Sequence, residues 1–110
     1  MNIMNAQDVK SRIEGSDDAL VVDVLPTDHY ESGHIPGAVN VPLAADRFVD
    51  AVEGVATSKE QPIIVYCASS ECDLSPKAAE QLEKAGFKKV ADFEGGIEEW
   101  KSAGFEISQN

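Results

Sequence analysis

Two cysteines close together in one short segment are the residues best suited to carry chemistry. Cys67 ends an apolar run, and Cys72 follows five positions later in the segment CASSECDLS. A cysteine thiolate is a strong nucleophile, and a second thiol nearby can attack a sulfur adduct on the first and close a disulfide. The pair therefore predicts nucleophilic sulfur chemistry or redox chemistry in this segment.

The residues on either side of Cys67 predict where its side chain lies. The run PIIVYC, residues 62–67, is typical of a strand buried on both faces. Ser75 and Pro76 are typical of a helix N-cap and a first helical position. Cys67 is thus expected on a loop between a parallel strand and a helix N-terminus, where free amides and the helix dipole stabilise a thiolate or a persulfide anion. The alternative is that Cys67 is a small buried core residue.

Cys72 has two interpretations. If the loop curls, the two cysteine Cα atoms can come within the roughly 4.4–6.8 Å that a disulfide requires. Cys72 would then be a resolving thiol, which attacks a persulfide or sulfenate on Cys67 and closes a disulfide. Otherwise it is a loop residue whose sulfur has no role.

Alternating strand and helix patterns define the elements that position these residues. Apolar runs predict strands at residues 19–22, 39–41, 62–67 and 89–93. Helical patterns cover residues 6–14, 43–52 and 76–85, with a helical turn at 28–32 and a last helix opened by Gly95 and Gly96. Strands alternating with helices predict an α/β fold with a mostly parallel sheet, in a single domain of residues 1–110.

Charge and composition exclude several classes of protein. The net charge of −11 repels nucleic acid and anionic lipid, so neither is an expected partner. No apolar run reaches the roughly 20 residues of a membrane helix, and the N-terminus has no signal-peptide pattern, which favours a cytoplasmic protein. Two cysteines and two histidines fit no standard zinc spacing, so neither a metal nor another cofactor is expected.

Four motifs occur in order along most of the chain. They are VDV at 22–24 with YESGHIPGAVNVP at 30–42, the strand end VYC at 65–67, the helix and strand pattern from AA at 78–79 to Val90, and EGGI at 94–97 followed by Trp100. Together they resemble the rhodanese family. The resemblance implies a rhodanese-like three-layer sandwich with a mostly parallel central sheet and helices on both faces. It also implies a sulfurtransferase, in which Cys67 takes sulfane sulfur from a donor as a persulfide and passes it to a thiol or protein acceptor.

The same resemblance implies the site residues. Cys67 is the expected catalytic nucleophile, with backbone amides of the loop around a persulfide. Cys72 is not part of the family pattern, and its possible role as a resolving thiol rests on its spacing from Cys67 alone. The remaining residues of that active-site loop are Ala68, Ser69, Ser70, Glu71, Asp73, Leu74 and Ser75. In the family pattern His34 belongs to a structural turn, where it is expected to hydrogen-bond to Asp23 or to a backbone carbonyl.

The loop departs from the family pattern in length and charge. It is about two residues longer than the common form, lacks the usual arginine and glycine, and adds Glu71 and Asp73. These changes predict weak thiosulfate:cyanide activity and favour a persulfide or polysulfide donor. Asp73 stands where the related phosphatases need an arginine, which disfavours phosphatase chemistry. The alternatives are a thiol–disulfide redox module using Cys67 and Cys72, or a non-catalytic regulatory domain. The sequence does not specify an oligomeric state.

Overall fold

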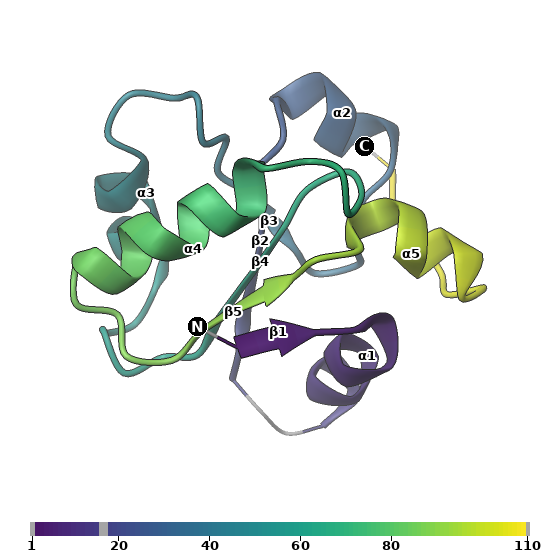
Figure 1. Cartoon of the computed structure of the whole chain (residues 1–110), viewed down its shortest axis with the longest axis horizontal. Helices are drawn as coiled ribbons and strands as arrows, with labels where there is room; N and C mark the ends of the chain where they lie inside the picture. Colours follow the sequence, from purple (N-terminus) through teal and green to yellow (C-terminus); the bar gives the residue numbers. More distant parts are fainter. Residues whose placement is uncertain (1, 16–17, 110) are drawn as a thin grey trace.

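Five parallel strands form one central sheet, in the order β1-β5-β4-β2-β3 (Figure 1). The computed structural model describes residues 2–15 and 18–109, so both ends of the predicted 1–110 domain and residues 16–17 lie outside the described part. The strands are β1 (Asn2–Met4), β2 (Leu20–Asp23), β3 (Val39–Asn40), β4 (Ile63–Tyr66) and β5 (Val90–Phe93). Each described strand pair is parallel, which confirms the predicted sheet.

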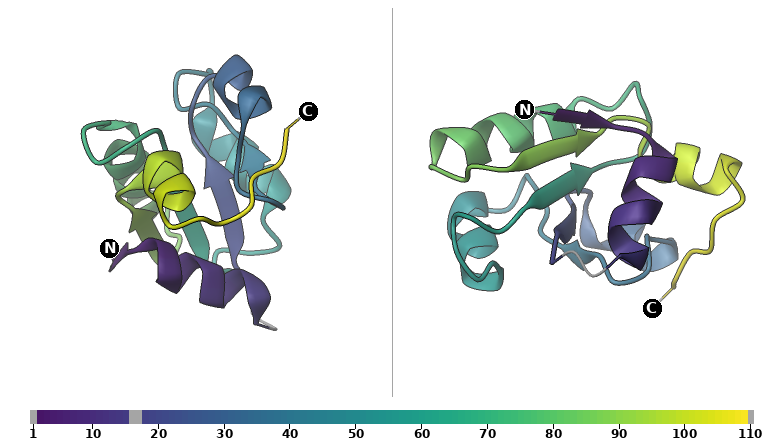
Figure 2. Two further views of the ribbon diagram at one scale, coloured as in Figure 1. Left: turned by 90° about the vertical axis from the view of Figure 1, so that its right-hand side faces the viewer. Right: turned by 90° about the horizontal axis from the view of Figure 1, so that it is seen from below.

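Helices cover both faces of the sheet and complete the three layers (Figures 1 and 2). They are α1 (Ala6–Glu14), α2 (Thr27–Ser32), α3 (Phe48–Val55), α4 (Leu74–Lys84) and α5 (Gly96–Ser102). Side chains of α3 and α4 form one hydrophobic core with the strands, and those of α1 and α5 form a second. Because side chains alternate along a strand, Val65 and Cys67 face α4, whereas Tyr66 faces the second core.

The first helix begins where the sequence predicted. Asn5 caps α1 by accepting a hydrogen bond from the Asp8 amide at 2.9 Å, and the Asp8 carboxylate accepts one from the Asn5 amide at 3.1 Å. The strand before it, β1, was not predicted. It is a three-residue edge strand with Ile3 exposed, so it has neither the length nor the buried alternation that identifies a strand in a sequence.

The predicted helix at 43–52 was placed too early. The helix α3 begins at Phe48 and ends at Val55, after a turn in which Arg47 has a φ of 63°. The helix cannot extend back to Leu43 because the left-handed conformation of Arg47 interrupts it. The Leu43 amide instead donates to the Val24 carbonyl oxygen at 3.0 Å, which continues the sheet pairing beyond β2. Phe48 and Val52 are buried, as the pattern indicated.

The chain after α5 returns across the molecule to the end of α2 (Figure 2). His34 and Ser108 exchange two backbone hydrogen bonds of 2.9 Å. Trp100 is buried as predicted, and its indole N–H donates to the Glu106 carbonyl oxygen at 2.7 Å, which fixes the start of this returning segment. Within the described residues, no helix combines the length and apolarity required to span a bilayer.

Candidate active site

Cys67 lies directly after β4, at the carboxyl end of the sheet. Its side chain has no exposed surface and packs in the core between the sheet and α4. The loop that follows leads into α4, so the strand–loop–helix arrangement around Cys67 is the predicted one. Ligands of open parallel sheets bind at this end of the strands.

Cys72 is joined to Cys67 by a disulfide, with the two Cα atoms 6.4 Å apart. The loop curls because the Cys72 amide donates to the Ser69 carbonyl oxygen at 3.0 Å. The structure therefore describes an oxidised form, in which Cys67 is both bonded and covered.

The predicted ring of amides around the Cys67 sulfur is not formed in this oxidised state. The amides of Glu71 and Cys72 donate to the Ser69 hydroxyl and carbonyl oxygens instead. Two polar atoms contact Cys67 Sγ: the Cys72 carbonyl oxygen at 3.7 Å and Ser75 Oγ at 3.5 Å.

The N-terminus of α5 holds the beginning of the loop in place. The amides of Ile97 and Glu98 donate to the carbonyl oxygens of Cys67 and Ala68, at 3.0 and 2.9 Å. Gly96 has a φ of +62°, and a Cβ atom there would collide with the Cys67 carbonyl oxygen. The EGGI motif is thus needed for the close approach of α5 to the backbone of Cys67.

Ser75 does not cap α4, contrary to the prediction. The helix begins at Leu74 with Asp73 at the N-cap position, so Ser75 lies inside the first turn. Its side chain is buried, and its hydroxyl lies beside Cys67 Sγ. Tertiary contact with the cysteine therefore replaces the local capping bond that the sequence pattern indicated.

Asp92, on β5, is a buried polar residue near Cys67 that the sequence analysis missed. It is 1% exposed, and burial raises the pKa of its carboxyl, with a smaller increase from Glu94 and an opposing hydrogen bond from Ser75. The available signal was a single acid within the otherwise apolar strand VADF. An acid in such a strand costs free energy unless it is paired, so it marks a position that needs an explanation.

The two acidic residues of the loop differ in their surroundings. Lys77, one turn along α4, pairs with Asp73 at 3.0 Å and holds the pKa of that carboxyl below its ordinary value. Glu71 is exposed and has no ion-pair partner among the described residues. Of the two negative charges predicted for the loop, that of Asp73 is thus offset by Lys77, and only that of Glu71 has no nearby positive charge among the described residues.

His34 has a structural position. Its Nδ1 lies 2.8 Å from the Tyr30 carbonyl oxygen, and its ring stacks on Tyr30 with 3.8 Å between ring centroids. Two hydrogen-bond partners were expected for His34, Asp23 or a backbone carbonyl, and the structure shows the backbone carbonyl, that of Tyr30. Asp23 instead accepts a 2.9 Å hydrogen bond from the Leu25 amide, close to the Tyr66 hydroxyl.

Asp23 is expected to make stability depend on pH. Its carboxyl is fully buried, and burial raises its pKa above the ordinary 3.8, so the folded chain binds this proton more tightly than the unfolded chain does. The free energy of unfolding should therefore fall as pH rises from about 4 through the raised pKa, by at most about 1.4 kcal/mol per pH unit. Urea denaturation from pH 4 to 7 should show Asp23→Asn gaining stability relative to wild type with rising pH. Asp73→Asn is the control: the pKa of Asp73 is lowered, so its contribution to stability changes only below about pH 4 and the difference from wild type should stay nearly constant from pH 4 to 7.

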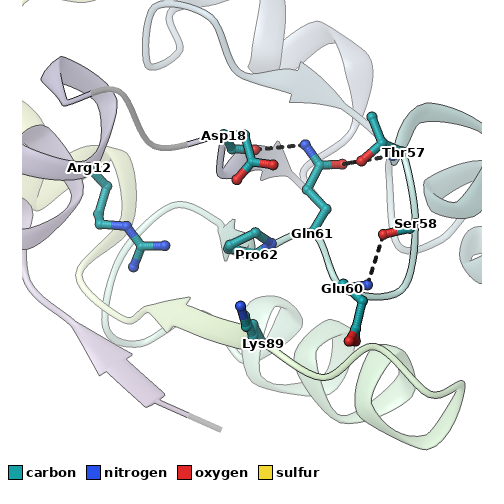
Figure 3. A pocket seen from close by; sticks show the side chains of 8 residues that line it. All are labelled: Arg12, Asp18, Thr57, Ser58, Glu60, Gln61, Pro62 and Lys89. Atoms are coloured by element: carbon teal, nitrogen blue, oxygen red, sulfur yellow. Dashed lines mark hydrogen bonds between the residues drawn. The ribbon is translucent and has the colours of Figure 1, made fainter.

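Two pockets flank the sheet at opposite ends. One of about 480 Å³ lies at the amino ends of the strands, where Gln61 bridges the Asp18 carbonyl oxygen and Thr57 (Figure 3). Neither cysteine lines this pocket. Its lining includes Pro62, which precedes β4, whereas Cys67 follows the opposite end of that strand. A second pocket, of about 310 Å³, adjoins the cysteine loop; its lining residues are Ile3, Met4, Asn5, Asp8, Ser70, Glu94, Gly95 and Glu99.

The pocket beside the loop is acidic. Two of its three carboxylates serve the fold: Asp8 caps α1, and Glu99 accepts a 2.6 Å hydrogen bond from the Ala6 amide. The third is Glu94, which directly follows β5 and lies two residues after Asp92. In the part of the chain that the structure describes, no group of three or more His, Cys, Asp or Glu side chains is arranged to hold a metal ion.

A parallel α/β sandwich with a cysteine at the end of a central strand defines the class of protein. The chain belongs to the rhodanese-like domain family, whose sequence model matches residues 5–103. It is 34% identical over 85 residues to a thiosulfate sulfurtransferase GlpE of Coxiella burnetii, covering 77% of this chain and 74% of that protein. The solution structure of a rhodanese-like domain from Anabaena sp. matches with a TM-score of 0.86 and 31% identity, over 100% of this chain and 80% of that one.

Other relatives are much longer than this chain. An HTH-type transcriptional regulator of Mycobacterium tuberculosis is 33% identical over 94 residues, which are 84% of this chain but 38% of that protein. A putative sulfur carrier protein of Bacillus subtilis is 30% identical over 91 residues, which are 83% of this chain and 46% of that protein. The chain thus spans less than half the length of several curated relatives that it matches.

Proposed function

We propose that the protein is a sulfurtransferase that carries sulfane sulfur as a persulfide on Cys67. The observation that supports this most is the place of Cys67, at the carboxyl end of β4 and before α4, in a chain of the rhodanese-like domain family. We also propose that residues 1–110 form a single domain and that the protein is located in the cytoplasm. The thiol reductants of that compartment would keep Cys67 reduced.

The reaction requires the reduced form. Two electrons from a thiol reductant open the Cys67–Cys72 disulfide and leave two thiols. The Cys67 thiolate then attacks the outer sulfur of a persulfide donor, and the donor leaves as a thiolate. An acceptor thiolate attacks the outer sulfur of the Cys67 persulfide and releases Cys67 as a thiolate again. The N–H groups of Leu74 and Ser75, which have no helical acceptor at the start of α4, are the donors available to the persulfide.

Charge around the loop favours a persulfide or polysulfide over thiosulfate. Thiosulfate carries two negative charges. Glu71 in the loop and Glu94 in the pocket beside it would repel these charges, and the loop has no arginine to offset the repulsion. Lys77 is engaged by Asp73 and offers only a partly neutralised charge. A persulfide such as cysteine persulfide carries a single negative charge on its sulfur chain, so it is repelled less than thiosulfate is.

The test is mass spectrometry of the reduced protein after incubation with cysteine persulfide, polysulfide or thiosulfate. The peptide with Cys67 should gain about 32 Da, one sulfur atom, fastest with the first two donors. Glu71→Gln should speed loading from thiosulfate by about 2–5-fold, the effect of one partly screened charge, and speed loading from the less charged cysteine persulfide by a smaller factor. No added sulfur from any donor would refute the proposal, and a preference for thiosulfate would refute the donor assignment.

The observed disulfide favours a second candidate, a thiol–disulfide redox module that uses Cys67 and Cys72. This function needs both thiols, and it predicts reversible oxidation with a reduction potential that can be measured in glutathione buffers. Sulfur transfer needs only Cys67. A chain without Cys72 therefore distinguishes the two candidates: it should still transfer sulfur but should have no redox activity.

A further inference from the structure

The structure holds Cys72 beside Cys67 by more than the disulfide itself. The Cα atoms of the two cysteines lie 6.4 Å apart, within the roughly 4.4–6.8 Å that a disulfide spans. Cys72 is partly buried and packs against the same hydrophobic core that contains Cys67. Sulfur transfer through Cys67 alone gives this second thiol no role, so its position against the first needs an explanation.

Backbone hydrogen bonds fix the loop that carries the two cysteines. Amides at the start of α5 donate to the carbonyl oxygens of Cys67 and Ala68, at 3.0 and 2.9 Å. The Cys72 amide donates to the Ser69 carbonyl oxygen at 3.0 Å, and α4 begins two residues after Cys72. These bonds involve neither sulfur atom, so reduction of the disulfide breaks none of them. The reduced loop therefore keeps the Cys72 thiol close to Cys67.

We propose that the protein also reduces sulfane sulfur and releases it as hydrosulfide, with Cys72 as the resolving thiol. This activity rests on the proposed sulfur transfer, because its substrate is the Cys67 persulfide. The Cys72 sulfur attacks the inner sulfur of that persulfide, which is Cys67 Sγ. A bond forms between the two cysteine sulfurs, and the bond from Cys67 Sγ to the outer sulfur breaks.

The step balances within one chain. The persulfide enters as an anion, the electron pair of the broken bond leaves on the outer sulfur, and the proton of the Cys72 thiol goes with it, so the product is HS⁻. The outer sulfur gains two electrons, and the two cysteines lose two. The other product is the Cys67–Cys72 disulfide, the form that the structure describes. A dithiol reductant supplies the two electrons and two protons that restore both thiols.

The nearness of Cys72 decides between release and transfer. Cys67 has no exposed surface in this loop conformation, so an external acceptor thiol reaches it only after the loop opens. Cys72 is already within bonding distance. A thiol tethered in this way acts at an effective concentration on the order of millimolar or above. Acceptor thiols well below that concentration should therefore receive little sulfur, and most of it should leave as hydrosulfide.

The test follows the sulfur loaded on the reduced whole chain. Wild type and Cys72→Ser are loaded with polysulfide, separated from donor and small thiols by rapid desalting, and followed by protein mass and by trapping of hydrosulfide with monobromobimane. Wild type should lose the added sulfur at least about tenfold faster than Cys72→Ser, and it should end as the disulfide with one hydrosulfide released per loaded chain. The rate should not change when the protein is diluted, because both thiols belong to one chain. If the persulfide lasts equally long in both proteins, the inference is wrong and sulfur transfer stands.

The double variant Cys72→Ser with Ser70→Cys is the matched control. It keeps a thiol in the loop but moves it to a position that lines the acidic pocket, whose wall includes neither cysteine. This variant should retain its persulfide as Cys72→Ser does. Release from it at the wild-type rate would show that the position of Cys72 is not the cause, which would overturn the inference. If wild type and both variants gain no sulfur from the donor, sulfur transfer is refuted and hydrosulfide release with it.

Discussion

Cys67→Ser is expected to remove all sulfur loading, measured as the absence of the added mass with every donor. In the proposed reaction the sulfur of Cys67 forms the covalent bond, and a serine hydroxyl in its place is not ionised near neutral pH. The rate of transfer to an acceptor thiol should fall by at least about a thousandfold, the range seen when a catalytic nucleophile is removed. A Cys67→Ser protein that still transfers sulfur would show that another group carries the reaction.

Cys72→Ser is the matched control, because both variants lose the same disulfide. Under reducing conditions it should load sulfur at about the wild-type rate. After mild oxidation wild type should be inactive until a thiol is added, since its Cys67 is then bonded and fully covered. The variant should lose this protection and be inactivated irreversibly by over-oxidation of Cys67. Equal loss of activity in both reduced variants would instead support the redox module.

Gly96→Ala is expected to have the largest effect on stability, at about 3 kcal/mol or more. A non-glycine residue at a φ of +62° costs about 1–2 kcal/mol, and the new Cβ would also lie 2.8 Å from the Ala68 carbonyl carbon and collide with the Cys67 carbonyl oxygen. The obstructing atoms belong to the backbone, so they cannot turn aside as a side chain would. Thermal unfolding should show a Tm lower by about 10 °C or more.

Gly37→Ala separates the two causes. Gly37 also has a positive φ, +85°, but a Cβ there meets nothing within 4 Å. Its substitution should cost only about 1–2 kcal/mol, the conformational part. The difference between the two variants is the close contact between α5 and the cysteine loop, and equal losses would show that this contact is not needed for stability. Sulfur loading by Gly96→Ala should also fall, because the Cys67 backbone must shift.

The order of elements could be read from the sequence because each one carries a local signal. Asn5 and Asp8 are spaced for a capping box, and the apolar run before Cys67 is long enough to identify a buried strand. Where the local signal is weak the sequence misled: β1, with three residues at an edge, was not predicted, and α3 begins later than predicted because Arg47 adopts a left-handed conformation before it.

The fold class and the position of Cys67 at the end of β4 could be inferred from the residues alone, because hydrophobic periodicity and turn residues act over neighbouring positions. The surroundings of that sulfur depend on how the elements pack in space. The spacing of Cys67 and Cys72 left two outcomes open, and the curl of the loop closed their disulfide. Ser75 contacts Cys67 instead of capping α4, and Asp92 is buried on the α4 side of β5. These last two relations depend on how α4 and the strands pack together, which no local pattern in the sequence indicates.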